Sequence, residues 1–261
     1  MNKAPIGTSE VINNLNGDLT NFWRVLQDEK NFLKFQRILE AMPFSQVEWD
    51  DATSETPEET VGRAVNFFVR CRQSRAGKFD CFATLSKTRV RRTMNEQASA
   101  WMTAVEGLPQ VASRLKRVVV LNQNALEVIR KEDSPKTLFY LDPPYLHETR
   151  VTTKDYQYEM SDKDHLEMLG ALLPLKGRVM LSGYPSKLYS SMLKDWNRKD
   201  FQIDNKASSA KVKPNKNRVP LDELLAFPVF RTFGDSSHSF HLHKVVLFDV
   251  KQLLPNSRNN L

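Results

Sequence analysis

The sequence predicts an α/β fold with a parallel, doubly wound sheet and a mainly helical segment inserted between its strands. Three observations support this class. An apolar run of β-type residues at 137–141 ends abruptly at Asp142, strands alternate with helices along the second half of the chain, and 40% of the 261 residues are hydrophobic. We therefore expect a soluble globule with a sizeable core.

The run at 137–141 is the element around which the chain is organised. It predicts a buried strand that delivers the Asp142 carboxylate to the carboxyl edge of the sheet. Pro143 and Pro144 follow, and because proline has no N–H and a fixed φ, the backbone there is rigid, with its carbonyls pointing outward. The simpler alternative is a strand followed by a proline-rich turn, in which Asp142 only caps a helix.

This loop suits the methylation of an exocyclic amine, whose lone pair is delocalised into its ring. Asp142 and the carbonyl of Pro143 can accept both N–H bonds of the amine and so localise the lone pair on nitrogen. Tyr145 can stack on the ring, as aromatic side chains do when an enzyme holds a base outside its duplex. The residues predict a pocket for a flat polar base.

The first half of the chain is predicted to be mainly helical. One helix carries Leu19, Phe22, Trp23 and Leu26 on a single face. The expected elements are, in order, a strand at 9–12, a turn at 13–18, this helix with its continuation over 32–39, an acidic loop at 50–59 and a helix at 59–70.

The next segment is the most basic part of the chain, with Phe79 and Phe82 interleaved. Its cations are Arg70, Arg72, Arg75, Lys78, Lys87, Arg89, Arg91 and Arg92. With a formal charge of +7 and a pI near 9.3, this cluster favours a polyanionic partner, because cations that neutralise phosphates release counterions. A solvated basic face is the alternative, but Asp80 is the only acid in the cluster.

The second half alternates between strands and helices. Ser161 and Asp164 form a capping-box pattern that starts one of these helices. The expected elements are helices at 95–105 and 111–117, a strand at 118–121, a helix at 125–131, the strand at 137–141, a polar loop at 147–159, a helix to 173, a strand at 178–181, a helix at 187–196, a strand at 201–203, a basic loop at 206–218 and strands at 224–230 and 244–250.

Several classes of protein are excluded by composition. Cys71 and Cys81 cannot form a disulfide framework, and no zinc-binding spacing is present. His238, His241 and His243 have no carboxylate or cysteine arranged with them, so we predict no metal site. No signal peptide or membrane span is recognisable. A reducing cytoplasm is the expected compartment.

Taken together, the sequence resembles the D12 class of DNA N6-adenine methyltransferases, the group that includes the Dam-type enzymes. The resemblance covers roughly residues 9–196. It rests on the Asp142-Pro143-Pro144-Tyr145 (DPPY) motif and on three further stretches: residues 13–19, residues 67–92 with Arg72-Gln73-Ser74-Arg75, and residues 159–184.

The resemblance implies transfer of a methyl group from S-adenosylmethionine to adenine N6 of a flipped base in double-stranded DNA, without metal. Asp142, Pro143, Pro144 and Tyr145 would be catalytic. Asn14, Asn124 and Asp142 would contact the cofactor, with Asn14 near its ribose and Asn124 near its adenine. The DNA-binding residues would be Arg70, Arg72, Gln73, Ser74, Arg75, Lys87, Arg89, Arg91 and Arg92. The host would be a bacterial or phage-infected cell, and a restriction-modification system is one context.

The chain departs from the family pattern in three places. The family begins with a glycine-rich strand and loop for the cofactor, and this chain starts after both. That strand is expected to lie between the strands at 9–12 and 137–141, so its loss predicts two unpaired edges within the sheet. Asn14 and Asn124 stand where the family usually has Asp, and residues 221–225 match its C-terminal strand only approximately.

We divide the chain into a partial N-terminal part of the methyltransferase domain (1–42), an inserted target-recognition subdomain (43–110), a catalytic domain (111–250) and a tail (251–261). The leading hypothesis is a site-specific DNA adenine methyltransferase, possibly truncated. A catalytically inactive DNA-binding remnant, or one half of a split enzyme whose second chain supplies the glycine-rich motif, is the alternative. A methyltransferase acting on RNA or on a protein amide ranks last.

Overall fold

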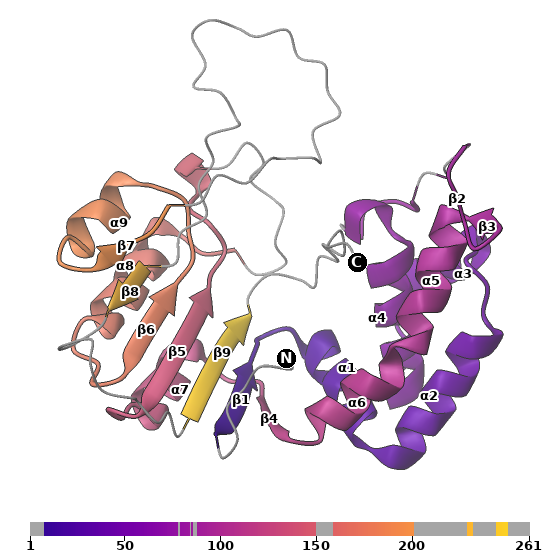
Figure 1. Ribbon diagram of the computed structural model, residues 1–261, viewed down its shortest axis with the longest axis horizontal. Helices are drawn as coiled ribbons and strands as arrows, with labels where there is room; N and C mark the ends of the chain where they lie inside the picture. Colours follow the sequence, from indigo (N-terminus) through magenta and orange to yellow (C-terminus); the bar gives the residue numbers. More distant parts are fainter. Residues whose placement is uncertain are drawn as a thin grey trace, which may run out of the picture. The chain divides into compact units, whose positions relative to one another are not determined.

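The computed structural model describes residues 8–77, 79–83, 85, 88–149, 159–200, 229–231 and 244–249. The chain divides into two compact units, one containing residues 10–123 and the other residues 124–250 (Figure 1). None of the helices in these described ranges has the length and apolar character needed to cross a membrane.

The first unit combines a pair of parallel strands with a set of helices. Strands β1 (Ser9–Asn13) and β4 (Val118–Leu121) pair in parallel, with Asn13 opposite Leu121. The other elements are α1 (Gly17–Gln27), α2 (Glu29–Ala41), α3 (Gln46–Ser54), α4 (Thr60–Gln73), η1 (Arg75–Gly77), β2 (Val90–Arg91), β3 (Met94–Asn95), α5 (Glu96–Glu106) and α6 (Leu108–Leu115).

Helix α1 begins where the sequence pattern places a turn. The Asn16 side chain accepts a hydrogen bond from Leu19 N and satisfies one of the N–H groups that the first turn leaves open. The predicted apolar face is confirmed, because all four of its side chains are buried: Leu19, Phe22, Trp23 and Leu26.

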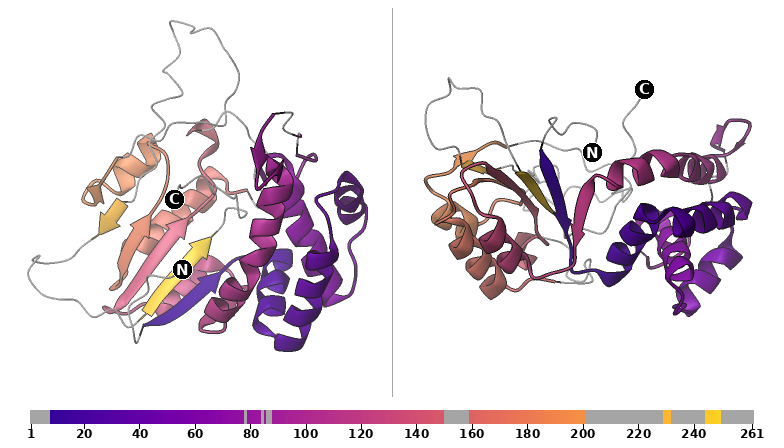
Figure 2. Two further views of the ribbon diagram at one scale, coloured as in Figure 1. Left: turned by 45° about the vertical axis from the view of Figure 1, so that its right-hand side comes forward. Right: turned by 90° about the horizontal axis from the view of Figure 1, so that it is seen from below.

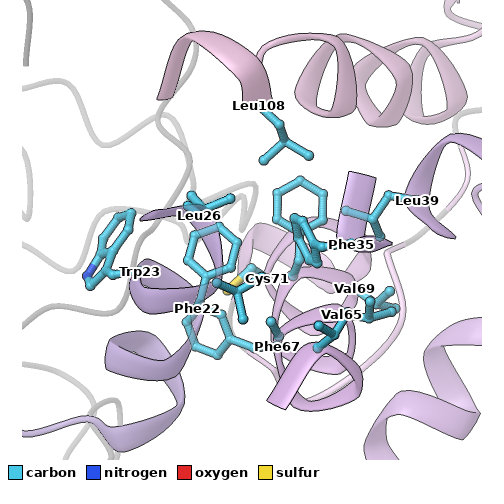
Figure 3. Close-up of a cluster of buried hydrophobic side chains, with 14 of the residues drawn as sticks. Phe22, Trp23, Leu26, Phe35, Leu39, Val65, Phe67, Val69, Cys71 and Leu108 are labelled. Carbon is cyan, nitrogen blue, oxygen red and sulfur yellow. The ribbon is translucent and has the colours of Figure 1, made fainter. Parts of the chain in front are cut away.

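An aromatic cluster forms the core of this unit. The ring of Phe22 lies 5.8 Å from that of Phe35, 5.6 Å from Phe67 and 5.9 Å from Phe68, and Phe68 in turn lies 5.5 Å from Trp101. Figure 3 shows several of these side chains directed toward one another. Because the rings come from α1, α2, α4 and α5, the helices over 17–41 share one core with those of the predicted 43–110 segment.

A short hairpin precedes α5. Strands β2 and β3 pair with Arg91 opposite Met94, so Arg92 and Thr93 form a two-residue turn. Both have positive φ, 49° and 60°, as a type I′ turn requires. Neither residue is glycine, so the turn holds two side chains in the left-handed region, where they crowd their own backbone.

The second unit is a five-stranded sheet in the order β9-β5-β6-β8-β7. Strand β5 is parallel to both β9 and β6, while β8 is antiparallel to β6 and β7. Its elements are α7 (Ala125–Glu132), β5 (Thr137–Asp142), η2 (His147–Thr149), α8 (Asp162–Leu172), β6 (Arg178–Leu181), α9 (Lys187–Met192), β7 (Asn197–Arg198), β8 (Val229–Arg231) and β9 (Lys244–Asp249). Helices α7 and α8 cover one face of this sheet (Figure 2). The predicted α/β class is confirmed.

Strand β9 corrects one expectation about this sheet. The loss of a first strand predicted an unpaired edge on β5, but β9 pairs with β5 along its whole length, from Thr137 opposite Lys244 to Asp142 opposite Asp249. Phe139 and Val246, which lie opposite each other, are both fully buried. An apolar strand such as β5 needs partners on both edges, and an apolar stretch near the C-terminus supplies one.

Other element boundaries differ from the expectations in part. Residues 50–54 belong to α3 rather than to a loop, because α3 packs on α4 and buries Ala52. Helix α9 ends at Met192, earlier than predicted. The capping box at Ser161 and Asp164 is confirmed, with both reciprocal hydrogen bonds present. The strand at 201–203 and the basic loop at 206–218 lie outside the described residues.

Candidate active site

The candidate site lies where β5 ends. Side chains alternate along this strand, so that Phe139 and Leu141 are buried and Asp142, its last residue, is partly buried. The next four residues, at 143–146, are all buried despite lying outside regular structure. The two prolines and their neighbours thus form a packed continuation of the strand, and the Asp142 carboxylate is held at its end.

A neighbouring serine contacts this carboxylate. Strand β6 runs parallel to β5 with Leu181 opposite Leu141, so Ser182 is the first residue beyond β6. Its hydroxyl donates to Oδ1 of Asp142 at 2.5 Å, and only 9% of Ser182 is exposed. We did not single out Ser182 from the sequence, although parallel strands end at the same edge and its position after a strand was a usable signal.

Two tyrosines meet beside Asp142. The rings of Tyr145 and Tyr184 lie 4.4 Å apart at 67°, an edge-to-face arrangement. Burial raises the pKa of Tyr184, and the negative charge of Asp142 raises it further. Tyr184 therefore stays protonated at neutral pH and adds an aromatic wall without adding charge. Tyr145 is 9% exposed, so the ring predicted to stack on a base is largely covered by the protein.

A side chain of α9 lies against the loop that carries Ser182 and Tyr184, and a side chain of α8 holds it there. A side chain at Gly183 would contact the ring of Tyr189, 3.3 Å from its Cε1, so this ring lies against the loop. The hydroxyl of Tyr189 is 3.0 Å from Nδ1 of the fully buried His165. Burial raises the pKa of Tyr189, which keeps the hydroxyl neutral. Residues from α8 and α9 thus fix the loop.

The opposite end of the same strand pair is also held. The carboxylate of Asp133 accepts hydrogen bonds from Lys176 N at 3.1 Å and Gly177 N at 2.8 Å. Gly177 is closely surrounded, because an added Cβ would lie 3.0 Å from both the ring of Phe139 and the carbonyl of Thr137. Strands β5 and β6 are therefore in fixed register from one end to the other.

The two asparagines predicted to contact the cofactor each accept a hydrogen bond from the backbone N–H two residues further along the chain. Asn14 accepts from Asn16 N at 2.7 Å through its side-chain oxygen. Asn124 is the N-cap of α7 and accepts from Leu126 N at 2.9 Å. An amide can both donate and accept, which is the chemistry that a ribose hydroxyl or an adenine ring calls for. Their assignment to the cofactor stays a prediction.

Part of the predicted DNA-binding set faces inward. Gln73 is fully buried; it accepts from Ser45 N at 3.0 Å and donates to the carbonyl of Pro43 at 3.3 Å. Ser74 is 5% exposed and accepts from the Trp49 indole at 2.8 Å. In this structure both side chains hold the subdomain together rather than form its surface.

The first two arginines of the set are also held by the protein itself. Arg70 pairs with Asp18 at 3.3 Å and lies over the Phe79 ring, 5.8 Å from its centroid. Arg72 is partly buried, its Nε lies out of contact with solvent, and burial lowers the pKa of its guanidinium.

Exposed arginines cluster on η1 and the β2–β3 hairpin. Arg75 and Arg89 make ion pairs at 3.5 Å with Asp80 and Glu96, while Arg92 is bonded to both oxygens of Glu106, at 3.1 and 3.2 Å. Arg91 is exposed on β2. Lys87 lies outside the described residues. Exposed ion pairs of this kind are weak and can be exchanged for phosphates.

In the described part of the chain, no three His, Cys, Asp or Glu side chains gather in a way that could hold a metal ion. His238, His241 and His243 are outside that part. What the described residues bring together is a carboxylate, a rigid proline backbone, a hydroxyl donor and two aromatic rings. That set fits the holding of a planar amine, not its hydrolysis.

A comparison with protein families gives one match over most of the chain. The model of the D12 class N6 adenine-specific DNA methyltransferases matches residues 2–210. The matched range includes the whole β5–β6 site and both predicted cofactor residues. No curated protein matches the chain closely enough to count as a relative.

Proposed function

Because the chain belongs to the D12 class of N6 adenine-specific DNA methyltransferases, we propose that it methylates adenine N6 in double-stranded DNA, on a base flipped out of the duplex. The methyl donor is S-adenosylmethionine, and the reaction takes place in a bacterial or phage-infected cell. The observation that carries the proposal is the geometry at the end of β5, where an oriented carboxylate adjoins a rigid backbone and an aromatic pair.

Asp142 and Pro143 activate the amine in this mechanism. The carboxylate accepts one N–H of the adenine amino group, and the carbonyl of Pro143 accepts the other. Both acceptors are fixed before the substrate arrives, because one side chain is held by Ser182 and the other residue is buried. The nitrogen is held close to tetrahedral, its lone pair is localised, and the proton released on methylation has an acceptor in Asp142.

Tyr145 and Tyr184 hold the base. The edge-to-face contact between the two rings orients Tyr145, and stacking on an aromatic ring is favourable by about 1–3 kcal/mol per base. Since Tyr145 is only 9% exposed, its ring face becomes available through a small shift of the loop after Pro144. We propose that entry of the base causes this shift.

S-adenosylmethionine supplies an activated methyl group bonded to a positively charged sulfur. The residue types assigned to it have suitable chemistry, since the amides of Asn14 and Asn124 can donate and accept hydrogen bonds and Asp142 provides a carboxylate. On this proposal Asn14 would contact the ribose and Asn124 the adenine ring. An amide accepts less strongly than the usual carboxylate, by about 1–2 kcal/mol, so we expect modest cofactor affinity.

Recognition of DNA falls to the exposed basic residues. Arg75, Arg89 and Arg92 can exchange their weak ion pairs for phosphates, and Arg91 is exposed on strand β2 next to Arg92. Arg70, Arg72, Gln73 and Ser74 shape the subdomain beneath them. This division predicts that substitutions of the exposed group reduce the salt dependence of DNA binding.

The alternative is an inactive DNA-binding remnant or half of a split enzyme. One observation bears on the split form: the β5 edge that a second chain was expected to cover is paired with β9. A donated strand must therefore displace β9 or pair elsewhere. An RNA or protein substrate remains the last-ranked possibility.

The proposal is tested with the full chain, tritiated S-adenosylmethionine and duplex DNA from a host lacking adenine methylation. We expect label in N6-methyladenine with the wild type, and a loss of at least about 1,000-fold in Asp142→Ala, with DNA affinity unchanged. Calorimetric titration with S-adenosylmethionine is run alongside. Transfer by Asp142→Ala at the wild-type rate would refute the mechanism, and DNA binding without any transfer or cofactor binding by the wild type would favour the remnant.

A further inference from the structure

The residue that follows β6 is placed by the sheet itself. Strand β6 pairs with β5 up to Leu181 opposite Leu141, and the backbone N–H of Ser182 then donates to the carbonyl of Leu141 at 2.9 Å. The ladder of hydrogen bonds thus continues one residue past the strand. Ser182 is fixed relative to β5 by its backbone, before its side chain makes any contact.

The hydroxyl of Ser182 donates to two acceptors at the end of β5. The hydroxyl oxygen lies 2.5 Å from Oδ1 of Asp142 and 3.1 Å from the carbonyl of Leu141. A carbonyl and an ionised carboxylate cannot donate, so Ser182 is the donor in both contacts. The shorter contact is the one to Asp142, and an O–H donor to a carboxylate is among the stronger protein hydrogen bonds.

The loop holding this hydroxyl is also fixed on its other side. Gly183 leaves room for the ring of Tyr189, which an added Cβ would approach to 3.3 Å, and Tyr189 is in turn bonded to the buried His165. Backbone on one side and an aromatic ring on the other leave Ser182 little freedom to move. Its hydroxyl is therefore a preorganised donor for Asp142.

We propose that Ser182 is a positioning residue for the methyl-transfer reaction: its hydroxyl fixes the rotation of the Asp142 carboxylate so that it meets the substrate amine in one orientation. This inference rests on the proposed function. Loss of this donor weakens the restraint on rotation about the Cβ–Cγ bond of Asp142, and the proportion of bound substrate in the reactive geometry falls. The carboxylate itself, and the surface that binds DNA, are unaffected.

A purely structural role gives a different expectation. If Ser182 only extends the β5–β6 ladder, its backbone N–H does this work, and removing the hydroxyl changes stability slightly and catalysis not at all. A positioning role lowers kcat and leaves the KM values for DNA and S-adenosylmethionine nearly unchanged, because the hydroxyl acts on the reacting geometry rather than on binding. The two roles are separated by this kcat-against-KM split.

The test compares Ser182→Ala and Ser182→Thr with the wild-type chain on unmethylated duplex DNA. Ser191→Ala is the matched control, since it removes an exposed serine hydroxyl bonded only to its own helix. We expect kcat to fall about 10- to 100-fold in Ser182→Ala with both KM values within about threefold. Ser182→Thr, which keeps the hydroxyl, restores most of kcat, and Ser191→Ala equals the wild type.

The outcomes separate this inference from the function on which it rests. Unchanged kcat in Ser182→Ala, or a rise in KM at constant kcat, overturns the positioning role while an active wild type upholds the methyltransferase. Failure of Ser182→Thr to restore kcat, with its folding intact by circular dichroism, also overturns it. Absence of transfer by the wild type overturns the proposed function, and the inference with it.

Discussion

Two parallel strand pairs, one in each unit, end in polar residues, but of different chemistry. At the end of β1 and β4 the polar residues are amides: Asn13 donates to the carbonyl of Gln123 at 2.9 Å and accepts from its N–H at 3.0 Å. At the end of β5 and β6 the polar residues are a carboxylate and a hydroxyl, joined by the contact between Asp142 and Ser182. At the carboxyl end of its strand pair, one unit has an amide that both donates to and accepts from the backbone, whereas the other unit has a carboxylate that can only accept.

On the proposed function, the strand end in the first unit serves stability and the strand end in the second serves chemistry. A buried amide that both donates and accepts closes the strand pair and stabilises it by about 1 kcal/mol per hydrogen bond. An ionised carboxylate can only accept, and its partial burial costs solvation free energy. On the proposed function this cost is retained because the carboxylate accepts a hydrogen bond from the substrate amine.

Exchanging the two groups gives the largest expected effects. Asn13→Asp turns a donor into an acceptor facing the carbonyl of Gln123, so we expect a loss of about 3 kcal/mol in unfolding free energy. Asp142→Asn, in contrast, changes that free energy by less than about 1 kcal/mol but lowers methyl transfer at least about 1,000-fold. Urea denaturation and the tritium assay measure the two quantities.

A control for this exchange is Asn122→Ala, which removes an exposed amide bonded to the carbonyl of Asn14 and is expected to cost less than about 1 kcal/mol. The comparison breaks if Asp142→Asn unfolds the protein as readily as Asn13→Asp does. It also breaks if Asn13→Asp is as stable as the wild type.

The next largest effect on stability is expected from the pairing of β9 with β5. Val246 is fully buried opposite Phe139, so Val246→Ala leaves a cavity and should cost about 2 kcal/mol of unfolding free energy. Val119→Ala is the matched control, since this valine also lies in a parallel strand but is 50% exposed, and its cost should be within about 0.5 kcal/mol. Equal costs for the two would show that β9 does not pack on β5 in solution.

The sequence predicted Asp142 because local signals sufficed. An apolar run with strand-type residues stops at an acidic residue and two prolines, and that pattern alone places the carboxylate at a strand end. The apolar face of α1 and the capping box at Ser161 were predictable for the same reason, since both depend on residues within one or two turns of a helix.

Features that depend on pairing between distant residues were harder to predict. Ser182 contacts Asp142 from 40 positions away; its place after a strand indicated the shared edge of the sheet, but only the β5–β6 register shows that the two side chains meet. The run at 244–250 was recognised as a strand, but nothing local showed that it pairs with β5. Gln73 is polar and lies among arginines, yet it is fully buried because its amide satisfies the backbone of two residues in another segment.

The two glycines beside the ends of β6 allow effects on stability and on catalysis to be compared within one strand pair. Gly177→Ala brings a methyl group to 3.0 Å from a backbone carbonyl and from the ring of Phe139, so we expect a loss of about 2 kcal/mol in unfolding free energy. Gly183→Ala meets only the side chain of Tyr189, at 3.3 Å, which can yield. Its cost should stay below about 1 kcal/mol, while kcat falls a fewfold because the loop carrying Ser182 shifts. A larger loss of unfolding free energy in Gly183→Ala than in Gly177→Ala would contradict this prediction.

The smallest expected effect is on proton binding, because only the β5–β6 end carries a charge. Burial is the main cause that raises the pKa of Tyr184, and the Asp142 carboxylate is the second. Asp142→Asn should therefore lower the pKa of Tyr184 while leaving it above the ordinary value of 10.0. Absorbance titration of tyrosinate, with Tyr184→Phe to identify the group, measures the shift.

The same substitution should change how stability depends on pH. A tyrosine whose pKa is higher in the folded than in the unfolded protein stabilises the folded state at pH values below the unfolded-state pKa. This stabilisation is lost as the pH rises through the folded-state pKa, so the fall in unfolding free energy above about pH 10 should be shallower in Asp142→Asn. Tyr189, whose pKa is raised by burial alone, should titrate alike in both proteins, and a shift there would mean that the substitution disturbed the loop rather than removed a charge.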